Sequence, residues 1–238
     1  MKKLVIIPTY NEKENIQKII SAVFSLKQNF HILVVDDSSP DGTSDIVKTL
    51  QAQYPNQLHL KIRNTKDGLG KAYLYGFHWA LNNNYDYIFE MDADFSHNPN
   101  DLPRLFEACK NGDMSIGSRY CKGVNVVNWP MSRVLLSFFA SKYVRFILDI
   151  PIHDTTAGFI CFSKYALENI DLNKIKLKGY GFQIEMKYRA YKKGLKIKEI
   201  PIIFTDRTQG ESKMNGGIIK EAIFGVINLK IKSILGKL

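Results

Sequence analysis

Two aspartates, Asp92 and Asp94, are the residues whose types and spacing most directly suggest chemistry. They follow the largely apolar run of residues 85–91, which predicts a strand, so both carboxylates can face the mouth of a parallel sheet. Hard carboxylate oxygens in that place suit a hydrated divalent cation that also contacts a phosphorylated substrate. A D-x-D pair is short and common, and its simpler interpretation is a solvated turn. The elements around the pair therefore decide between the two interpretations.

Strands and helices alternate through the first half of the chain. Apolar runs predict four strands, at residues 4–7, 32–35, 58–62 and 85–91. The segments between them carry apolar residues at helical spacing, and Asn11 with Glu14 three residues later has the pattern of a capping box. This alternation predicts an α/β fold with a doubly wound, mostly parallel sheet and helices on both faces. In such sheets ligands bind beyond the carboxyl ends of the strands, where both aspartates fall.

The second half of the chain is less regular. Its patterns predict a strand at 113–117, a helix at 131–149, a helix at 182–193 and a strand at 195–204. Charged residues interrupt the 131–149 helix, so we do not expect it to span a membrane. We predict a catalytic domain over 1–215 and a basic amphipathic helix over 216–238. That helix could lie on a membrane surface, pack on its own domain or contact a partner helix.

Composition narrows the classes of partner. The net charge is +10, and twelve Lys and Arg against four acids lie from Lys187 onward, which favours an anionic partner. Aromatic residues do not alternate with these cations and no nucleic-acid motif is present, so we expect no nucleic-acid partner. Three cysteines without ligand spacing and an N-terminus without a signal-peptide pattern predict a cytosolic location.

Several common sites are absent from the sequence. No P-loop, no complete G-x-G-x-x-G after a strand, no nucleophile elbow and no histidine cluster occurs. Acidic turns at strand ends and basic residues downstream remain. That combination suits a nucleotide-diphosphate substrate, with carboxylates for the ribose and a metal ion and cations for the phosphates.

The motifs in their order resemble those of the inverting family 2 glycosyltransferases, which have the GT-A fold. The resemblance rests on residues 8–12 (PTYNE), 35–43 (VDDSSPDGT), 68–70 (GLG) and 91–97 (MDADFSH). Motifs in the second half resemble those of the polyprenol (dolichyl) phosphate mannosyltransferases: 117–120 (GSRY), Trp129 with Arg133, 154–159 (DTTAGF), 179–183 (GYGFQ), 206–207 (DR) and 210–213 (GESK). Together they cover the chain from Leu4 to about Lys213.

The resemblance implies a role for each matching residue. The implied donor-binding residues are Pro8, Tyr10, Glu12, Val35, Asp37, Asp92, Ala93, Asp94, Arg119, Arg207 and Lys213. Mg²⁺ or Mn²⁺ would be held by Asp92, Asp94 and Ser96. The acceptor phosphate would meet Arg119, Arg133 and Ser137. Asp94, Arg207 and Lys213 would carry the catalytic charges.

The implied reaction is transfer of mannose from GDP-mannose to a polyprenyl monophosphate with inversion. The alternative keeps the fold and changes the donor to UDP-glucose or UDP-N-acetylglucosamine. The sequence departs from the family pattern at Ile160, where many relatives have Arg, and at Lys71, where relatives often have Thr. Since no long membrane extension follows residue 213, we expect a peripheral protein on the cytoplasmic membrane face. A separate membrane protein that recruits it is left open.

Overall fold

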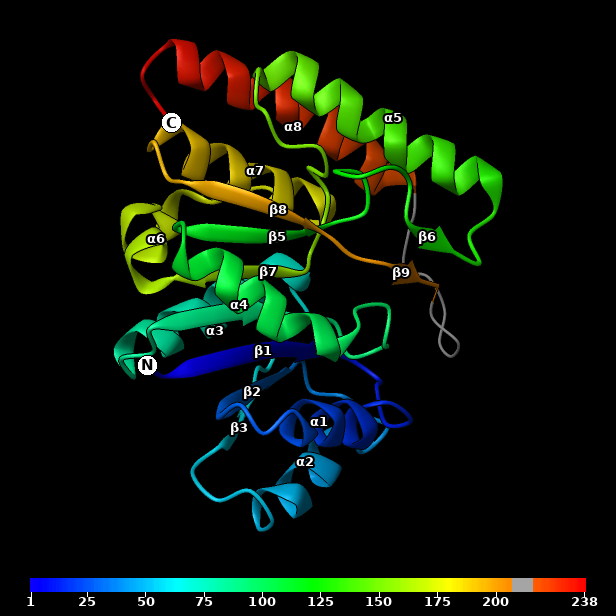
Figure 1. The fold of residues 1–238 in the computed structure, drawn as a ribbon, viewed down its shortest axis with the longest axis vertical. Helices are drawn as coiled ribbons and strands as arrows, with labels where there is room; N and C mark the ends of the chain where they lie inside the picture. The colour runs from blue at the N-terminus through cyan, green and yellow to red at the C-terminus, as the bar shows by residue number, and fades with distance from the viewer. Residues whose placement is uncertain (207–215) are drawn as a thin grey trace.

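The computed structural model describes residues 1–206 and 216–238 and contains one central sheet between two layers of helices (Figure 1). The order of its seven strands is β3-β2-β1-β4-β7-β5-β8, and β6 and β9 form a separate parallel pair. The strands are β1 Lys3–Thr9, β2 Phe30–Asp36, β3 Leu58–Ile62, β4 Tyr87–Glu90, β5 Met114–Ser118, β6 Val126–Val127, β7 Ile160–Ser163, β8 Ile197–Pro201 and β9 Phe204–Thr205.

The helices complete the α/β alternation. They are α1 Ile16–Ser25, α2 Thr43–Gln51, α3 Leu69–Asn82, α4 Leu102–Lys110, α5 Met131–Leu148, α6 Lys164–Asn169, α7 Gly179–Lys192 and α8 Gly216–Ile234, with short 3₁₀ turns at Pro99–Asp101 and Leu172–Lys174. The predicted mostly parallel, doubly wound sheet is confirmed. Strand β7 runs antiparallel between β4 and β5, and the sequence analysis did not predict it.

Two hydrophobic cores lie on opposite faces of the sheet. Alternate residues of β1 face opposite sides, so Ile6 packs with α3, α6 and α7 while Ile7 packs with α1, α2 and α4. Burial on both faces explains why these strands are continuous apolar runs. Helices α5 and α8 lie side by side at one end of the molecule (Figure 1), where the Tyr143 hydroxyl donates to the Ile223 carbonyl at 3.2 Å.

Local signals were less reliable than strand patterns. The predicted helix start at Asn11 is wrong: α1 begins at Ile16, and Asn11 has a left-handed φ of 59° in the preceding loop. Asn15 at the start of α1 makes no side-chain cap hydrogen bond. The Asp41 carboxylate instead joins the loop before α1 to the start of α2, because it accepts the Lys13 N–H and the Thr43 N–H and hydroxyl. The strand predicted at 195–204 is also wrong in extent, because it divides into β8 and β9.

The last helix packs on the body of the protein. Val226 and Leu229 of α8 are buried in the same core as α3 and α7. A Cβ added at Gly225 would lie 2.8 Å from the Leu177 side chain, so the helix approaches its neighbour closely. The division of the chain at residue 215 remains a proposal.

Candidate active site

A cavity of about 580 Å³ opens where the carboxyl ends of β1, β4 and β5 meet. The N-terminus of α7 and the segment 154–159 form its far wall. Ten of the predicted site residues line it: Pro8, Tyr10, Glu12, Asp37, Asp92, Ala93, Asp94, Ser96, Arg119 and Arg133. Residues as far apart as Pro8 and Arg133 therefore share one concave surface, as ligand sites in such folds do.

Four predicted residues lie elsewhere or are not described. The Val35 side chain is buried in the core and does not line the cavity. The Ser137 hydroxyl accepts a hydrogen bond from the Tyr120 hydroxyl at 2.8 Å, outside the cavity lining. Arg207 and Lys213 lie outside the described residues.

The acidic turn is held by local hydrogen bonds. The Tyr73 hydroxyl donates to Asp92 Oδ1 at 3.4 Å, and the Ser96 N–H donates to Asp94 Oδ1 at 3.1 Å. Phe95, between them, adopts a φ of 59°. A bulky residue in the left-handed region is strained and persists only when its surroundings hold it there. The turn therefore presents both carboxylates in a fixed arrangement.

The composition of this turn fits a hard divalent cation. Among the described residues no group of three or more His, Cys, Asp or Glu forms a complete protein cage. Mg²⁺ is bound through one or two carboxylates together with substrate phosphates and water, so two aspartates are enough. The Ser96 hydroxyl oxygen is buried without a hydrogen-bond partner. Such an atom is a suitable further ligand or phosphate contact beside Asp94.

His97 holds the acidic turn through a hydrogen bond to its backbone, and its own ring is held by stacking. Its Nδ1 accepts the Asp92 N–H at 3.2 Å, and its ring stacks on Phe159 with centroids 4.8 Å apart. Burial lowers the pKa of His97 to about 4, against the opposing effect of Asp94, so the ring is neutral at pH 7. The sequence showed this histidine only as part of a motif.

A buried ion pair fixes the main cation of the cavity. Arg119 donates through Nε and Nη2 to both carboxylate oxygens of Asp154, at 2.7 and 2.6 Å, and its backbone N–H donates to the same group. Its Nη2 also donates to Thr156 at 2.8 Å. Burial opposes charge on Arg119, but the Asp154 carboxylate outweighs it and raises the pKa of the guanidinium. Arg119 therefore remains charged in a buried wall of the site.

A second cation lies at the rim. Arg133 of α5 pairs with Asp206 at 2.9 Å and lies over the Trp129 ring, 4.1 Å from its centroid. Trp129 lines the cavity, and its Nε1 is buried without a hydrogen-bond partner. The indole thus supports a cation, whereas the sequence analysis assigned no role to it beyond its motif.

The opposite end of the cavity has its own charged pair and an added cation. Asp37 lies 3.4 Å from Arg63; burial raises the pKa of its carboxyl even though Arg63 acts in the other direction. Lys66 lies over the Tyr10 ring at 3.5 Å and lines the cavity. Sequence reasoning missed Lys66, although its position two residues before Gly68 was the available signal.

Buried polar groups at the cavity received no role in the sequence predictions, although Gln183 belongs to the 179–183 motif. Gln183 Nε2 donates to Glu90 at 2.6 Å, and Lys187 Nζ donates to the Ala157 carbonyl at 2.6 Å. Burial raises the pKa of Glu90 to about 8 and lowers that of Lys187 to about 8. These groups tie α7 to β4 and to the 154–159 wall. Gln183 and Glu90 are 93 residues apart along the chain, and Lys187 and Ala157 are 30 residues apart, so no local sequence pattern predicts these contacts.

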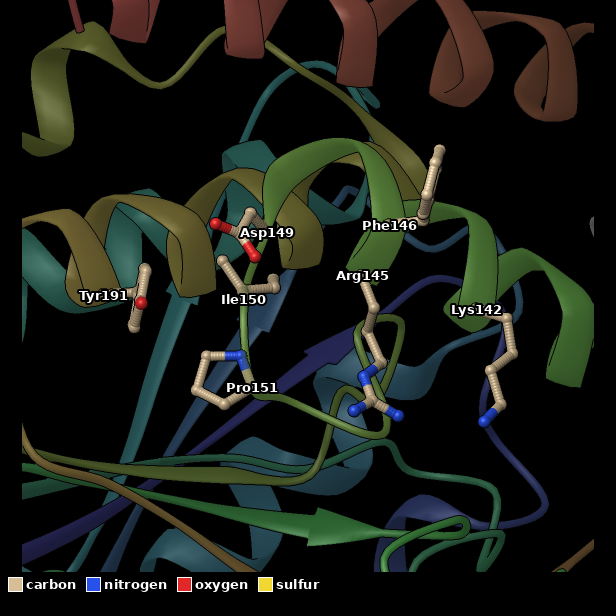
Figure 2. A pocket seen from close by; sticks show the side chains of 7 residues that line it. All are labelled: Lys142, Arg145, Phe146, Asp149, Ile150, Pro151 and Tyr191. Carbon is tan, nitrogen blue, oxygen red and sulfur yellow. The ribbon is translucent and has the colours of Figure 1, made fainter.

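A separate cavity of about 480 Å³ lies at the C-terminal end of α5 (Figure 2). Its lining is Lys142, Arg145, Phe146, Asp149, Ile150, Pro151 and Tyr191. Lys142 and Arg145 extend to one side of α5, and Phe146 points to the other (Figure 2). The lining of this cavity contains none of the predicted site residues, and we therefore assign the chemistry to the cavity of about 580 Å³.

Comparisons with known proteins identify the family of the chain. Residues 4–171 match the family model described as glycosyl transferase family 2. The chain is 47% identical to the polyprenol monophosphomannose synthase of Mycolicibacterium smegmatis, over 99% of this chain and 89% of that protein. It is also 47% identical to the undecaprenyl-phosphate mannosyltransferase of Micrococcus luteus, over 95% and 93% of the two chains.

More distant similarity extends to an archaeal protein and to solved structures. The dolichol-phosphate mannosyltransferase of Pyrococcus furiosus is 41% identical, over 96% of this chain and 64% of that protein. Glucosyl-3-phosphoglycerate synthase of Mycobacterium tuberculosis, solved with Mn²⁺ and UDP, superimposes with a TM-score of 0.66 at 16% identity, over 99% of this chain and 80% of that chain. At that identity the likeness shows the GT-A-like fold alone.

Proposed function

Because the chain belongs to glycosyltransferase family 2, we propose that it transfers mannose from GDP-mannose to a polyprenyl monophosphate. The acceptor phosphate oxygen bonds to the anomeric carbon while the bond to the GDP oxygen breaks. The products are an inverted, β-linked mannosyl phosphoryl polyprenol and GDP. The observation that carries the proposal is one cavity in which the Asp92–Asp94 turn and the Arg119 and Arg133 side chains face a common space.

The donor occupies the end of the cavity near β1 and β2. Pro8, Tyr10, Glu12 and Asp37 line that end and would bind the guanosine. Lys66, beside Tyr10, adds a cation within reach of the nucleotide's phosphates. A base and ribose bound there place the diphosphate toward the carboxyl end of β4, where the acidic turn lies.

The acidic turn would hold the metal ion. Asp92 and Asp94 supply carboxylate oxygens, and Ser96 supplies the buried hydroxyl that lacks a partner. Mg²⁺ or Mn²⁺ bound there would neutralise charge on the departing diphosphate. The named structural neighbour was solved with Mn²⁺ and UDP, which supports a divalent ion in this fold.

The acceptor brings its own nucleophile. A lipid monophosphate is anionic at neutral pH, so the reaction needs no strong general base. It needs cations that bring two anions together, and Arg119 and Arg133 supply them at the cavity wall and rim. Ser137 would assist on the acceptor side, and Arg207 and Lys213 remain proposed diphosphate contacts. Correct placement of both reactants supplies much of the rate.

The lipid acceptor requires access to a membrane surface. No described helix is long and apolar enough to cross a bilayer. The neighbouring helices α5 and α8 instead expose many large apolar side chains: Met131, Leu135, Leu136, Phe139, Phe146, Ile223, Phe224, Ile227, Ile231 and Ile234. Lys142 and Arg145 of α5 extend to the side opposite Phe146 (Figure 2), and α8 itself carries the cations Lys230 and Lys232. We propose that this α5–α8 face lies on the cytoplasmic membrane surface, attracted by anionic lipid.

The test is transfer of radiolabelled sugar to a short polyprenyl phosphate. The assay compares GDP-mannose, UDP-glucose and UDP-N-acetylglucosamine, with Mn²⁺ or with EDTA. A chelator-sensitive product from GDP-mannose alone, lost in Asp94→Ala and kept in the surface control Asp45→Ala, supports the proposal. Turnover with a UDP-sugar and none with GDP-mannose would overturn the donor. No lipid product from any donor would overturn the acceptor.

A further inference from the structure

His97 has one ring nitrogen whose function the turn does not explain. Nδ1 accepts the Asp92 N–H at 3.2 Å, so in the neutral ring the proton is on Nε2. The ring is held in place by stacking on Phe159 and by an edge contact with Phe204, with centroids 5.5 Å apart. The structure therefore fixes both the tautomer and the direction of the Nε2–H group.

That Nε2–H group opens on the active-site cavity. His97 lines the cavity. Among residues 1–206 and 216–238, its Nε2 makes no hydrogen bond. Nε2 is also not one of the fully buried polar atoms without a partner, so it is accessible to a ligand. A preorganised donor at the wall of a binding cavity is placed for a ligand acceptor.

Two further groups border the same point. A Cβ added at Gly158 would lie 3.9 Å from His97 Cε1 and 3.5 Å from Gln183 Nε2, with nothing else within 4 Å. The Gln183 amide is oriented by its 2.6 Å hydrogen bond to Glu90, and its carbonyl oxygen has no partner. Gln183 is 3% exposed and lines the cavity. A glycine without a side chain thus lies between an N–H donor and an amide.

The groups at this point favour an uncharged ligand group over a phosphate. The side chains nearest to Gly158 are the His97 ring and the Gln183 amide, and the acidic turn lies beside them. A neutral imidazole and an amide cannot offset the charge of a phosphate. A hydroxyl, which both donates and accepts, matches an N–H donor beside an amide carbonyl.

We propose that His97, Gly158 and Gln183 form the subsite for the hexosyl group of the donor, with His97 Nε2 donating to one sugar hydroxyl. This inference rests on the proposed function, because it places the transferred sugar of a nucleotide donor there. It gives His97 two separate tasks: Nδ1 holds the acidic turn and Nε2 binds the sugar.

The two tasks can be separated by substitution. Asn places an amide oxygen near the position of Nδ1 and reaches no further, so His97→Asn keeps an acceptor for the Asp92 N–H and removes the sugar contact. His97→Phe removes both. The measurement is affinity for GDP-mannose and for GDP, each with Mn²⁺. We expect His97→Asn to keep the GDP affinity and to lose about fivefold to tenfold in GDP-mannose affinity, the size of one hydrogen bond.

Deoxy donors give an internal control. GDP-linked 2-, 3-, 4- and 6-deoxymannose each lack one hydroxyl. If Nε2 contacts a hydroxyl, one of these donors loses nothing further on His97→Asn, whereas the others lose as GDP-mannose does. Equal loss for all four and for GDP overturns the subsite, because His97 then acts only through the turn.

Failure of the subsite can be told apart from failure of the proposed function. A wild-type protein that binds UDP-glucose and not GDP-mannose refutes the proposed donor. The same comparison of UDP-glucose with UDP in His97→Asn then still tests whether Nε2 contacts the sugar. If His97→Asn changes the affinity for the sugar nucleotide and the affinity for the free nucleotide by the same factor, the inference is overturned for either donor.

Discussion

Replacing Asp154 by Asn tests how the cavity keeps its buried cation. Asp154 is fully buried and accepts three hydrogen bonds from Arg119. Asn has nearly the same shape but carries no charge, so Arg119 stays buried without its counter-ion. Breaking a buried pair in this way costs about 3–5 kcal/mol. Because Asn keeps one acceptor oxygen, we expect a loss of about 3 kcal/mol from a total of roughly 5–15 kcal/mol.

The assay is urea unfolding of the wild type and of Asp154→Asn at pH 7. Asp45→Asn is the matched control, because Asp45 pairs with Lys48 at 2.8 Å on the surface with both side chains more than half exposed. Surface substitutions change stability by no more than about 0.5 kcal/mol. A loss below about 1 kcal/mol for Asp154→Asn would refute the reasoning, because Arg119 would then be solvated rather than dependent on its partner.

The pH dependence gives the same test a second readout. Burial would raise the pKa of Asp154, but Arg119 and its hydrogen bonds outweigh burial and lower it from the ordinary value of 3.8. A depressed folded pKa stabilises the protein above the unfolded value and loses that contribution as the pH falls through the folded pKa. The difference between wild type and Asp154→Asn should therefore be full at pH 7 and shrink below pH 3.8. A constant difference would contradict this assignment.

Three further predictions concern the membrane face, the sheet and the loops that Asp41 joins. Phe139→Ser, at a side chain that is 62% exposed on α5, should weaken binding to anionic vesicles about tenfold in co-sedimentation, whereas Tyr165→Ser, at a similarly exposed aromatic outside this face, should not. Gly76→Ala should lower the free energy of unfolding by about 1–3 kcal/mol in urea titration, because the new Cβ would lie 2.8 Å from Ile6. Asp41→Ala should cost about 1 kcal/mol in the same assay, since two backbone N–H groups lose their acceptor.

The sequence by itself determined the sheet and the acidic turn. Strands buried on both faces must be apolar throughout, so the runs before Pro8, Asp36 and Asp92 could be recognised without neighbours. Parallel strands place their carboxyl ends at one edge, which is why the position of Asp92 and Asp94 after a predicted strand, and not their spacing by itself, indicated a ligand site. The ordered family motifs then indicated the remaining residues of the site.

Tertiary structure decided what depends on distant partners. Asn11 had the local pattern of a helix cap, but α1 begins at Ile16 without a side-chain cap, and Asp41 binds the loop before it. The pairing of Arg119 with Asp154 joins residues 35 apart, and that of Glu90 with Gln183 joins residues 93 apart. Such contacts depend on burial and on the close approach of elements, which neither periodicity nor spacing encodes. The chemical role of a residue such as His97 therefore became visible only when its ring nitrogens had identified neighbours.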